Sequence, residues 1–218
     1  MEFSLLTSGL ATTGGVISAA TWATFAAFCL VAYLLGSIST AIIVCRLGAY
    51  PDPRSEGSGN PGATNVLRVA GKPAAAVTLF GDVLKGVVPL LLARMAGIEG
   101  AALAWVGFFA FLGHLYPVFF GFDGGKGVAT ALGVINTLAW PAGVAVMLSW
   151  LLVFLPFRVS SLAAIASWLL APLYTAWLAP AYVVPVSLMA VLLLWRHQQN
   201  IRDLLGGRER SFRKPGGD

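Results

Sequence analysis

Seven long apolar runs dominate this sequence and limit what it can fold into. A bilayer core about 30 Å thick requires about 20 apolar residues for each spanning helix, and most of the runs approach that length. The sequence therefore predicts an all-α, polytopic membrane helix bundle with about seven transmembrane helices. The runs are residues 22–44, 73–95, 101–120, 127–140, 141–157, 159–178 and 181–196.

The scarcity of charge excludes a soluble helical bundle. Only 11% of the 218 residues are charged, whereas soluble domains carry roughly 25%. Residues 162–195 contain no charged side chain at all, so the helices expected there have no polar face for water. We therefore interpret the chain as an integral membrane protein.

The number of crossings depends on the short run 127–140. It is separated from 141–157 only by the step from Trp140 to Pro141. Proline disfavours helical geometry in the residue before it, so we expect a helix break there. The alternative is a single re-entrant unit over 127–157, which would lower the count toward five.

The positions of the cations predict the orientation. Seven crossings put the termini on opposite sides, and twelve of the fourteen lysines and arginines then fall on one side. The other side receives Arg94 together with Glu2 and Glu99. The positive-inside rule predicts an external N-terminus and a cytoplasmic C-terminus. The twelve cations are Arg46, Arg54, Arg68, Lys72, Lys126, Arg158, Arg196, Arg202, Arg208, Arg210, Arg213 and Lys214.

We expect one domain over 1–218, with a weakly structured N-terminus (1–20) and a basic tail (210–218). The cations cluster at the ends of the apolar runs, which fits lipid headgroups rather than nucleic acid. The two cysteines lack the spacing of metal ligands, and we expect neither a metal nor another cofactor. We also expect a monomer in contact with membrane lipids.

Three polar segments interrupt or end the apolar runs, and the orientation above places all three in the cytoplasm. They are 55–68 (SEGSGNPGATNVLR), 113–130 (GHLYPVFFGFDGGKGVAT) and 196–209 (RHQQNIRDLLGGRE). Each combines glycines, amides or hydroxyls with fixed cations. Backbone N–H groups and cations at the mouth of an apolar bundle suit a phosphorylated substrate.

The first segment has three glycines within six residues, Gly57, Gly59 and Gly62. Such a turn can form an anion-binding concavity, and residues 63–69 could begin a short helix that adds to it. The alternative is a flexible linker. We favour phosphate binding because donors are dense here: Ser58, Asn60, Thr64, Asn65 and Arg68.

The second segment places Lys126 in a glycine turn formed with Gly124, Gly125 and Gly127. It is not a P-loop, because the residue after the lysine is glycine rather than serine or threonine. What remains is a mobile cation at a helix start, with Thr130 and His114 nearby in sequence.

Four further polar residues have helical spacing. His197 and Asn200 lie three positions apart at the end of the last run. Asp82 and Lys85 have the same spacing inside a crossing, where an unpaired charge is costly, so we predict that they pair with each other.

These residues resemble a known family, the bacterial acyl-phosphate:glycerol-3-phosphate acyltransferases (PlsY). The first motif is carried by Gly36-Ser37, Asp52-x-Arg54, GSGNPGATN (57–65) and Arg68. The second is GHLYPVFFGFDGGKGVAT (113–130), and the third is His197-x-x-Asn200-Ile201 with Gly207 and Glu209. Gly81-Asp82 and Lys85-Gly86 also fit. One position departs from the pattern, since Asp203 stands where the family usually has a basic residue.

The resemblance implies transfer of a fatty acyl group from acyl phosphate to the 1-hydroxyl of sn-glycerol 3-phosphate. The products are lysophosphatidic acid and phosphate, and the place is the bacterial cytoplasmic (inner) membrane with the site facing the cytoplasm. We assign catalysis to Ser37, Lys126, His197 and Asn200, and support to Asp82 and Lys85. Substrate and phosphate binding is assigned to Arg54, Gly57, Ser58, Gly59, Asn60, Gly62, Thr64, Asn65, Arg68, His114, Gly124, Gly125, Gly127 and Thr130.

Two alternatives stay open at this point. The proton acceptor could be His114, His197 or a substrate phosphate oxygen. A transporter for an organic phosphate would also have glycine turns and broken helices. It would need polar groups from both membrane sides, however, and the outer ends of the runs are nearly bare.

Overall fold

The computed structural model describes residues 19–212, and every regular element in that range is helical. The chain divides into two compact units between Leu138 and Ala139. Most of the N-terminal stretch predicted as weakly structured (1–20) and residues 213–218 of the predicted basic tail lie outside the described residues. Within 19–212 the all-α prediction is confirmed.

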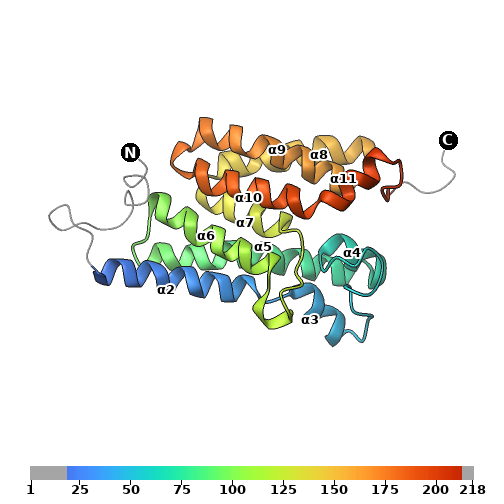
Figure 1. Cartoon of the computed structure of the whole chain (residues 1–218), viewed down its shortest axis with the longest axis horizontal. Helices are drawn as coiled ribbons and strands as arrows, with labels where there is room; N and C mark the ends of the chain where they lie inside the picture. The colour runs from blue at the N-terminus through green and yellow to red at the C-terminus, as the bar shows by residue number, and fades with distance from the viewer. Residues whose placement is uncertain (1–18, 213–218) are drawn as a thin grey trace. The chain divides into compact units, whose positions relative to one another are not determined.

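The first unit is built on two helix pairs. Helix α2 packs along α6, and α5 packs along α7, while the short α4 lies against α5 (Figure 1). Leu90, Val106, Phe111 and Val134 are among its fully buried side chains. The elements are α2 (Ala19–Gly36), α3 (Thr40–Leu47), α4 (Ala63–Val69), α5 (Gly71–Met95), α6 (Gly100–Leu115), η1 (Val118–Phe120) and α7 (Val128–Leu138).

Small residues allow these helices to approach closely. A Cβ atom on Gly86 of α5 would collide with the carbonyl oxygen of Thr130 in α7. A Cβ on Gly36 of α2 would collide with the carbonyl oxygen of Ala110 in α6. Membrane helices associate largely through such packing, since lipid offers no hydrophobic driving force between them.

The first apolar run is broken, which the sequence did not predict. Residues 37–39 are not helical, and they separate α2 from α3 inside the expected crossing 22–44. Ser37 Oγ donates to the carbonyl oxygen of Tyr33 at 2.8 Å. Serine side chains compete in this way for helical carbonyls, which favours a bend or an end.

The second unit is a set of antiparallel apolar helices with a short polar helix at its end. Helix α8 packs on α9, and α9 packs on α10. The predicted helix break is found one residue earlier, at Ala139 between α7 and α8, and the Trp140–Pro141 step lies in the first turn of α8. The elements are α8 (Trp140–Phe157), α9 (Ser160–Leu178), η2 (Pro180–Tyr182), α10 (Val183–Arg196) and α11 (Gln198–Leu205).

By length and composition, five helices of the described chain can cross a membrane, or six if the bent pair Pro180–Arg196 and Gln198–Leu205 is one span. The predicted seven is higher because α7 has only 11 residues. At 1.5 Å per residue it is about 16 Å long, well short of a bilayer core. The five are Thr21–Leu47, Gly71–Met95, Gly100–Phe120, Trp140–Phe157 and Ser160–Leu178.

Candidate functional site

The glycine loop between α3 and α4 is held together by one amide side chain. Asn65 is 1% exposed, and its Oδ1 accepts the backbone N–H of Ser58 at 2.8 Å. Its Nδ2 donates to the carbonyl oxygens of Pro53 at 2.7 Å and Glu56 at 2.9 Å. Both amide protons are thus used inside the loop, so Asn65 shapes the turn rather than offering these protons to a ligand.

The loop also uses some of the backbone donors that the sequence assigned to phosphate. The N–H of Gly59 donates to the carbonyl of Glu56 at 3.0 Å, and Ser58 N–H is taken by Asn65. Gly57 and Gly59 have φ values of 65° and 71°, which other residues rarely adopt. The predicted short helix over 63–69 is observed as α4, and it carries Thr64 and Arg68.

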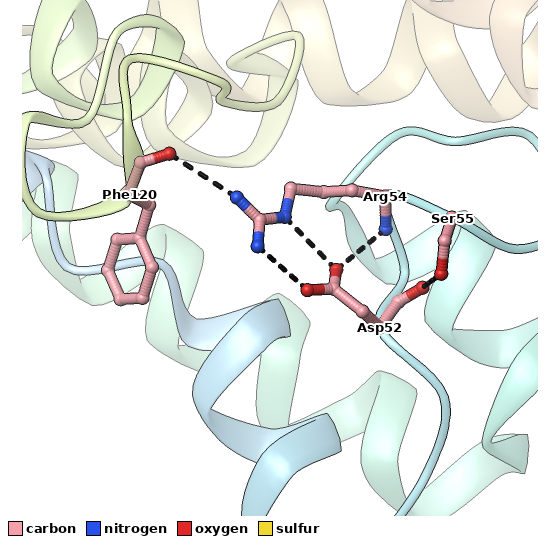
Figure 2. A network of polar contacts seen from close by, with 4 residues as sticks. All are labelled: Asp52, Arg54, Ser55 and Phe120. Carbon is pink, nitrogen blue, oxygen red and sulfur yellow. Dashed lines mark hydrogen bonds and ion pairs between the residues drawn. The ribbon is translucent and has the colours of Figure 1, made fainter.

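Arg54 connects this loop to the second polar segment. Its Nη2 and Nε bind the two carboxylate oxygens of Asp52 at 2.7 and 3.1 Å, in a bidentate pair (Figure 2). Its Nη1 donates to the carbonyl oxygen of Phe120 at 3.3 Å. The Arg54 side chain is 26% exposed and that of Asp52 33%. The guanidinium is therefore fixed in direction while it stays within reach of a ligand.

The electrostatics of this pair favour full ionisation. The side-chain hydrogen bonds from Arg54 hold the pKa of the Asp52 carboxyl below its ordinary value, with smaller help from the charge of Arg46. Asp52 in turn raises the pKa of Arg54, and the nearby charge of Asp123 adds to this. An arginine that is always charged suits the recognition of a phosphate oxygen.

A second ion pair lies buried in α5. Lys85 Nζ is 2.8 Å from Asp82 Oδ1, which confirms the pairing predicted from their spacing. The same ammonium donates to the carbonyl oxygen of Ile38 at 3.0 Å. Ile38 lies in the break between α2 and α3, directly after Ser37, which is fully buried.

The polar cluster continues to His114 and Thr130. Thr130 Oγ1 donates its only proton to the backbone carbonyl of Asp82 at 2.8 Å, and it lies 3.2 Å from His114 Nδ1. His114 Nδ1 must therefore carry a hydrogen and donate to Thr130. The N–H of Gly125 donates to the carbonyl of His114 at 3.2 Å, and a Cβ on Gly125 would collide with His114 Nε2. The imidazole thus lies directly against the glycine turn.

Lys126 follows this packed turn and precedes α7. Gly124, Gly125 and Gly127 are buried, whereas Lys126 is half-buried. The carbonyl of Gly127 accepts the N–H of Ala131 at 2.8 Å, which begins the helix.

In the first loop, Asn60 is half-buried, and the carbonyl of Gly62 accepts the N–H groups of Asn65 and Val66 at the start of α4.

In the second unit, a carboxylate organises the third segment. Glu209 accepts hydrogen bonds from Asn200 Nδ2 at 3.0 and 3.1 Å and from Ser161 Oγ at 2.8 Å. His197 is 2% exposed, and its Nδ1 lies 2.8 Å from the carbonyl oxygen of Leu193. A carbonyl can only accept, so Nδ1 carries the hydrogen and Nε2 is the nitrogen that could accept a proton.

The structure brings some of the predicted site residues together and adds polar contacts that sequence reasoning did not single out. Within the first unit, Asp82, Lys85, His114 and Thr130 come together through the contacts above, and Ser37 is the chain neighbour of Ile38, whose carbonyl accepts from Lys85. The roles of Asp52, Glu209 and Ser161 were missed, as was the Ile38 carbonyl. The spacing of Asp52 and Arg54, and a lone Glu209 between Arg208 and Arg210, were the available signals for two of them.

Comparison with known proteins places this geometry in a family. The sequence model of the glycerol-3-phosphate acyltransferase family matches residues 26–207. This range includes the first two polar segments in full and the third as far as residue 207. A glycerol-3-phosphate acyltransferase of Pseudomonas putida (strain W619) is 55% identical over 184 residues, 84% of this chain and 97% of the relative. One of Idiomarina loihiensis is 53% identical over 183 residues, 84% of this chain and 93% of the relative.

Solved structures agree. The crystal structure of PlsY (YgiH), an integral membrane glycerol 3-phosphate acyltransferase, matches in its glycerol 3-phosphate form with a TM-score of 0.82 at 41% identity. That match covers 87% of this chain and 96% of the solved one. The lysophosphatidic acid form matches with a TM-score of 0.78 at 40% identity, over 87% and 95%. The chain therefore belongs to the glycerol-3-phosphate acyltransferase family, as its three motifs indicated.

Proposed function

We propose that this protein transfers a fatty acyl group from acyl phosphate to the 1-hydroxyl of sn-glycerol 3-phosphate. The hydroxyl oxygen forms an ester bond with the acyl carbonyl carbon, and the bond from that carbon to the phosphate oxygen breaks. The products are lysophosphatidic acid and inorganic phosphate. The observation that carries the proposal is the likeness, over 87% of the chain, to a protein solved in its glycerol 3-phosphate form.

The half-exposed cations support binding of two phosphorylated reactants. Arg54 is oriented by Asp52 and by the Phe120 carbonyl, and Lys126 follows a packed glycine turn. We assign the substrate phosphates to these two side chains and to the loop over 57–65, with Thr64 and Arg68 on α4 beside it. Charge-assisted hydrogen bonds to phosphate are among the stronger polar contacts in proteins.

An acyl phosphate is already activated, so the enzyme requires no covalent acyl intermediate. Holding the hydroxyl against the carbonyl carbon can supply much of the acceleration. Cations near the carbonyl oxygen and the departing phosphate stabilise the charge that develops there. Ser37, His197 and Asn200 are the groups we assign to orienting the reactants.

The proton of the attacking hydroxyl requires an acceptor. In both His114 and His197 the Nδ1 atom is a donor, so Nε2 is the ring nitrogen that can take a proton. His114 Nε2 faces the backbone of Gly125, which leaves less room for a reacting hydroxyl. This geometry favours His197 or a substrate phosphate oxygen over His114 as the acceptor.

The direct test is product formation by purified protein in detergent. With acyl phosphate as the only donor, we expect lysophosphatidic acid acylated at the 1-position, identified by NMR. Acyl-CoA or acylated acyl carrier protein, offered as the only donor, should give no lysophosphatidic acid. Activity with acyl-CoA alone would contradict the donor assignment. If no donor gives product and the protein instead carries glycerol 3-phosphate into proteoliposomes, the result would favour a transporter.

We further propose that the whole chain is one acyltransferase domain of the bacterial inner membrane, with its N-terminus outside. The family match runs through both units without interruption. The short α7 can complete a seventh crossing together with the non-helical residues before it, because Gly124, Gly125 and Gly127 are buried in protein rather than exposed to lipid. A reporter active only in the cytoplasm should work after Asp218 and fail at Gly97. The opposite pattern would overturn this orientation.

A further inference from the structure

We propose that Asp82, Lys85, His114 and Thr130 form a buried clamp whose role is to position two parts of the active site. One is the helix break that carries Ser37, and the other is the glycine turn before Lys126. In this assignment His114 and Thr130 act through the turn and do not themselves contact substrate. The inference rests on the proposed function, because the clamp matters only if those two parts handle the reactants.

The first arm of the clamp is Lys85. Its ammonium lies between the Asp82 carboxylate, at 2.8 Å, and the Ile38 carbonyl, at 3.0 Å. The Ile38 carbonyl lies in the break between α2 and α3, outside either helix, and its hydrogen-bond donor comes from another element. Lys85 supplies that donor and so fixes the backbone adjacent to Ser37.

The second arm is Thr130 and His114. Thr130 joins α7 to the Asp82 backbone, and His114 Nδ1 donates to the Thr130 hydroxyl at 3.2 Å. The Asp82 carboxylate lies 3.8 Å from the same nitrogen. The ring and carbonyl of His114 then bear directly on Gly125. The glycine turn is therefore connected to the Asp82–Lys85 ion pair through Thr130 and His114.

Stability alone does not account for this arrangement. A buried ion pair loses much solvation, and an apolar pair of similar volume is often as stable or more so. All four residues are more than nine-tenths buried, with exposures of 3% for Asp82, 7% for Lys85, 6% for His114 and 0% for Thr130. Each connects elements that are distant in sequence, which an apolar contact would do with less directional precision.

The test uses full-length protein with acyl phosphate and glycerol 3-phosphate, and compares Lys85→Met and Thr130→Val with a matched control. Thr78→Val serves as the control, since Thr78 is a fully buried threonine of α5 whose hydroxyl donates to the carbonyl of Ala74 in the same helix at 2.9 Å. Lys85→Met should lower kcat at least about tenfold and change KM by less than about twofold, because the directed hydrogen bond to the Ile38 carbonyl, next to Ser37, is lost.

Thr130→Val should act on the other kinetic constant. Loosening the glycine turn should raise KM for the phosphorylated substrates about tenfold, with kcat changed less. Thr130→Ser keeps the hydroxyl and should restore most of the loss. Thr78→Val should remain within about twofold of the wild type in both constants.

The double variant Asp82→Asn with Lys85→Met separates positioning from stability. Removing both charges should return the melting temperature to near that of the wild type, whereas kcat should stay low. Recovery of both together would mean a merely structural role. Kinetics of Thr130→Val equal to those of Thr78→Val would likewise overturn the clamp. If the wild type makes no lysophosphatidic acid from acyl phosphate, the proposed function and the clamp both fail.

Discussion

Two ion pairs of the first unit, Asp82–Lys85 and Asp52–Arg54, join the same charge types in opposite surroundings. Asp82 and Lys85 lie within one helix, with side chains 4% and 7% exposed, and the ammonium ends on a backbone carbonyl. Asp52 and Arg54 lie in a loop, with side chains 33% and 26% exposed, and the guanidinium makes a bidentate contact. The first pair is closed off by protein, and the second remains open to water.

This difference separates two uses of charge. In the buried pair, losing one partner leaves the other charge stranded in a low-dielectric interior, so it contributes to holding the backbone. In the half-exposed pair, water and salt screen the attraction, so its contribution to stability is small. Arg54 can share its donors with an arriving phosphate without such a cost. The first pair is suited to holding the backbone in place, and the second is suited to the phosphate contact proposed for Arg54.

The largest effect should come from neutralising each acid in turn. We expect Asp82→Asn to lower the free energy of unfolding by about 3–5 kcal/mol, because Lys85 is left buried and unpaired. Asp52→Asn should cost less than about 1 kcal/mol. Unfolding in detergent micelles measures both. Equal losses in the two variants would remove the distinction between the pairs.

The next effect concerns Lys126, a half-buried cation that is in neither of the two ion pairs. Lys126→Ala should reduce kcat/KM about ten- to a hundredfold, the size of one charge-assisted contact of roughly 1.5–3 kcal/mol. Arginine should restore only part of this, since its planar fork differs from a compact ammonium. The melting temperature should stay unchanged. Normal turnover of the folded alanine variant would rule out the role of Lys126.

A smaller effect should follow from straining the loop that carries Arg54. Gly59 has φ of 71°, and a side chain there would lie 3.3 Å from the Arg54 carbonyl. Gly59→Val should raise KM for the phosphorylated substrates several-fold, because a β-branched residue adopts positive φ poorly. Gly97→Val is the matched control, with φ of 81° and open space around it. Equal kinetics in the two variants would favour a flexible linker over a phosphate loop.

The smallest effect concerns pH. The pKa of Asp52 is lower in the folded protein than its ordinary value of 3.8. The stability from this pair is therefore fully present above that value and is lost only as the pH falls through the lowered folded pKa. Between pH 5 and 8, wild type and Asp52→Asn should show parallel stability curves. A difference that grows across this range would mean that Asp52 titrates there and that the pair is not as described.

Features set by local spacing were predictable from the sequence. The helix over 63–69, the break before Pro141 and the pairing of Asp82 with Lys85 all depend on residues a few positions apart. The crossing count was less predictable. Hydropathy shows that a segment avoids water, but it does not show whether the segment faces lipid or packs inside protein. Helix α7 packs inside protein, with more than half of its residues buried.

Contacts between distant residues were out of reach. Lys85 and Ile38 are 47 positions apart, and Glu209 and Ser161 are 48 apart. Nothing in the sequence ranks these partners above other carbonyls or hydroxyls of the chain. Asn65 shows the same limit on a smaller scale, because an amide in a polar loop can bind a ligand or fold the loop. Only the geometry decided between the two.

The position of Glu209 has a consequence for how the molecule is made. Its carboxylate bridges Asn200 to Ser161 of α9, and further along the chain Phe212 N–H donates to the carbonyl of Arg158 at 2.8 Å. Every apolar helix is synthesised before this residue leaves the ribosome. A chain interrupted at position 208 can therefore insert all its helices and still lack the group that sets the Asn200 amide. The role proposed for Asn200 therefore implies that membrane insertion and catalytic competence are separate events in the biogenesis of this protein, and that only the second waits for the last few residues of the described chain.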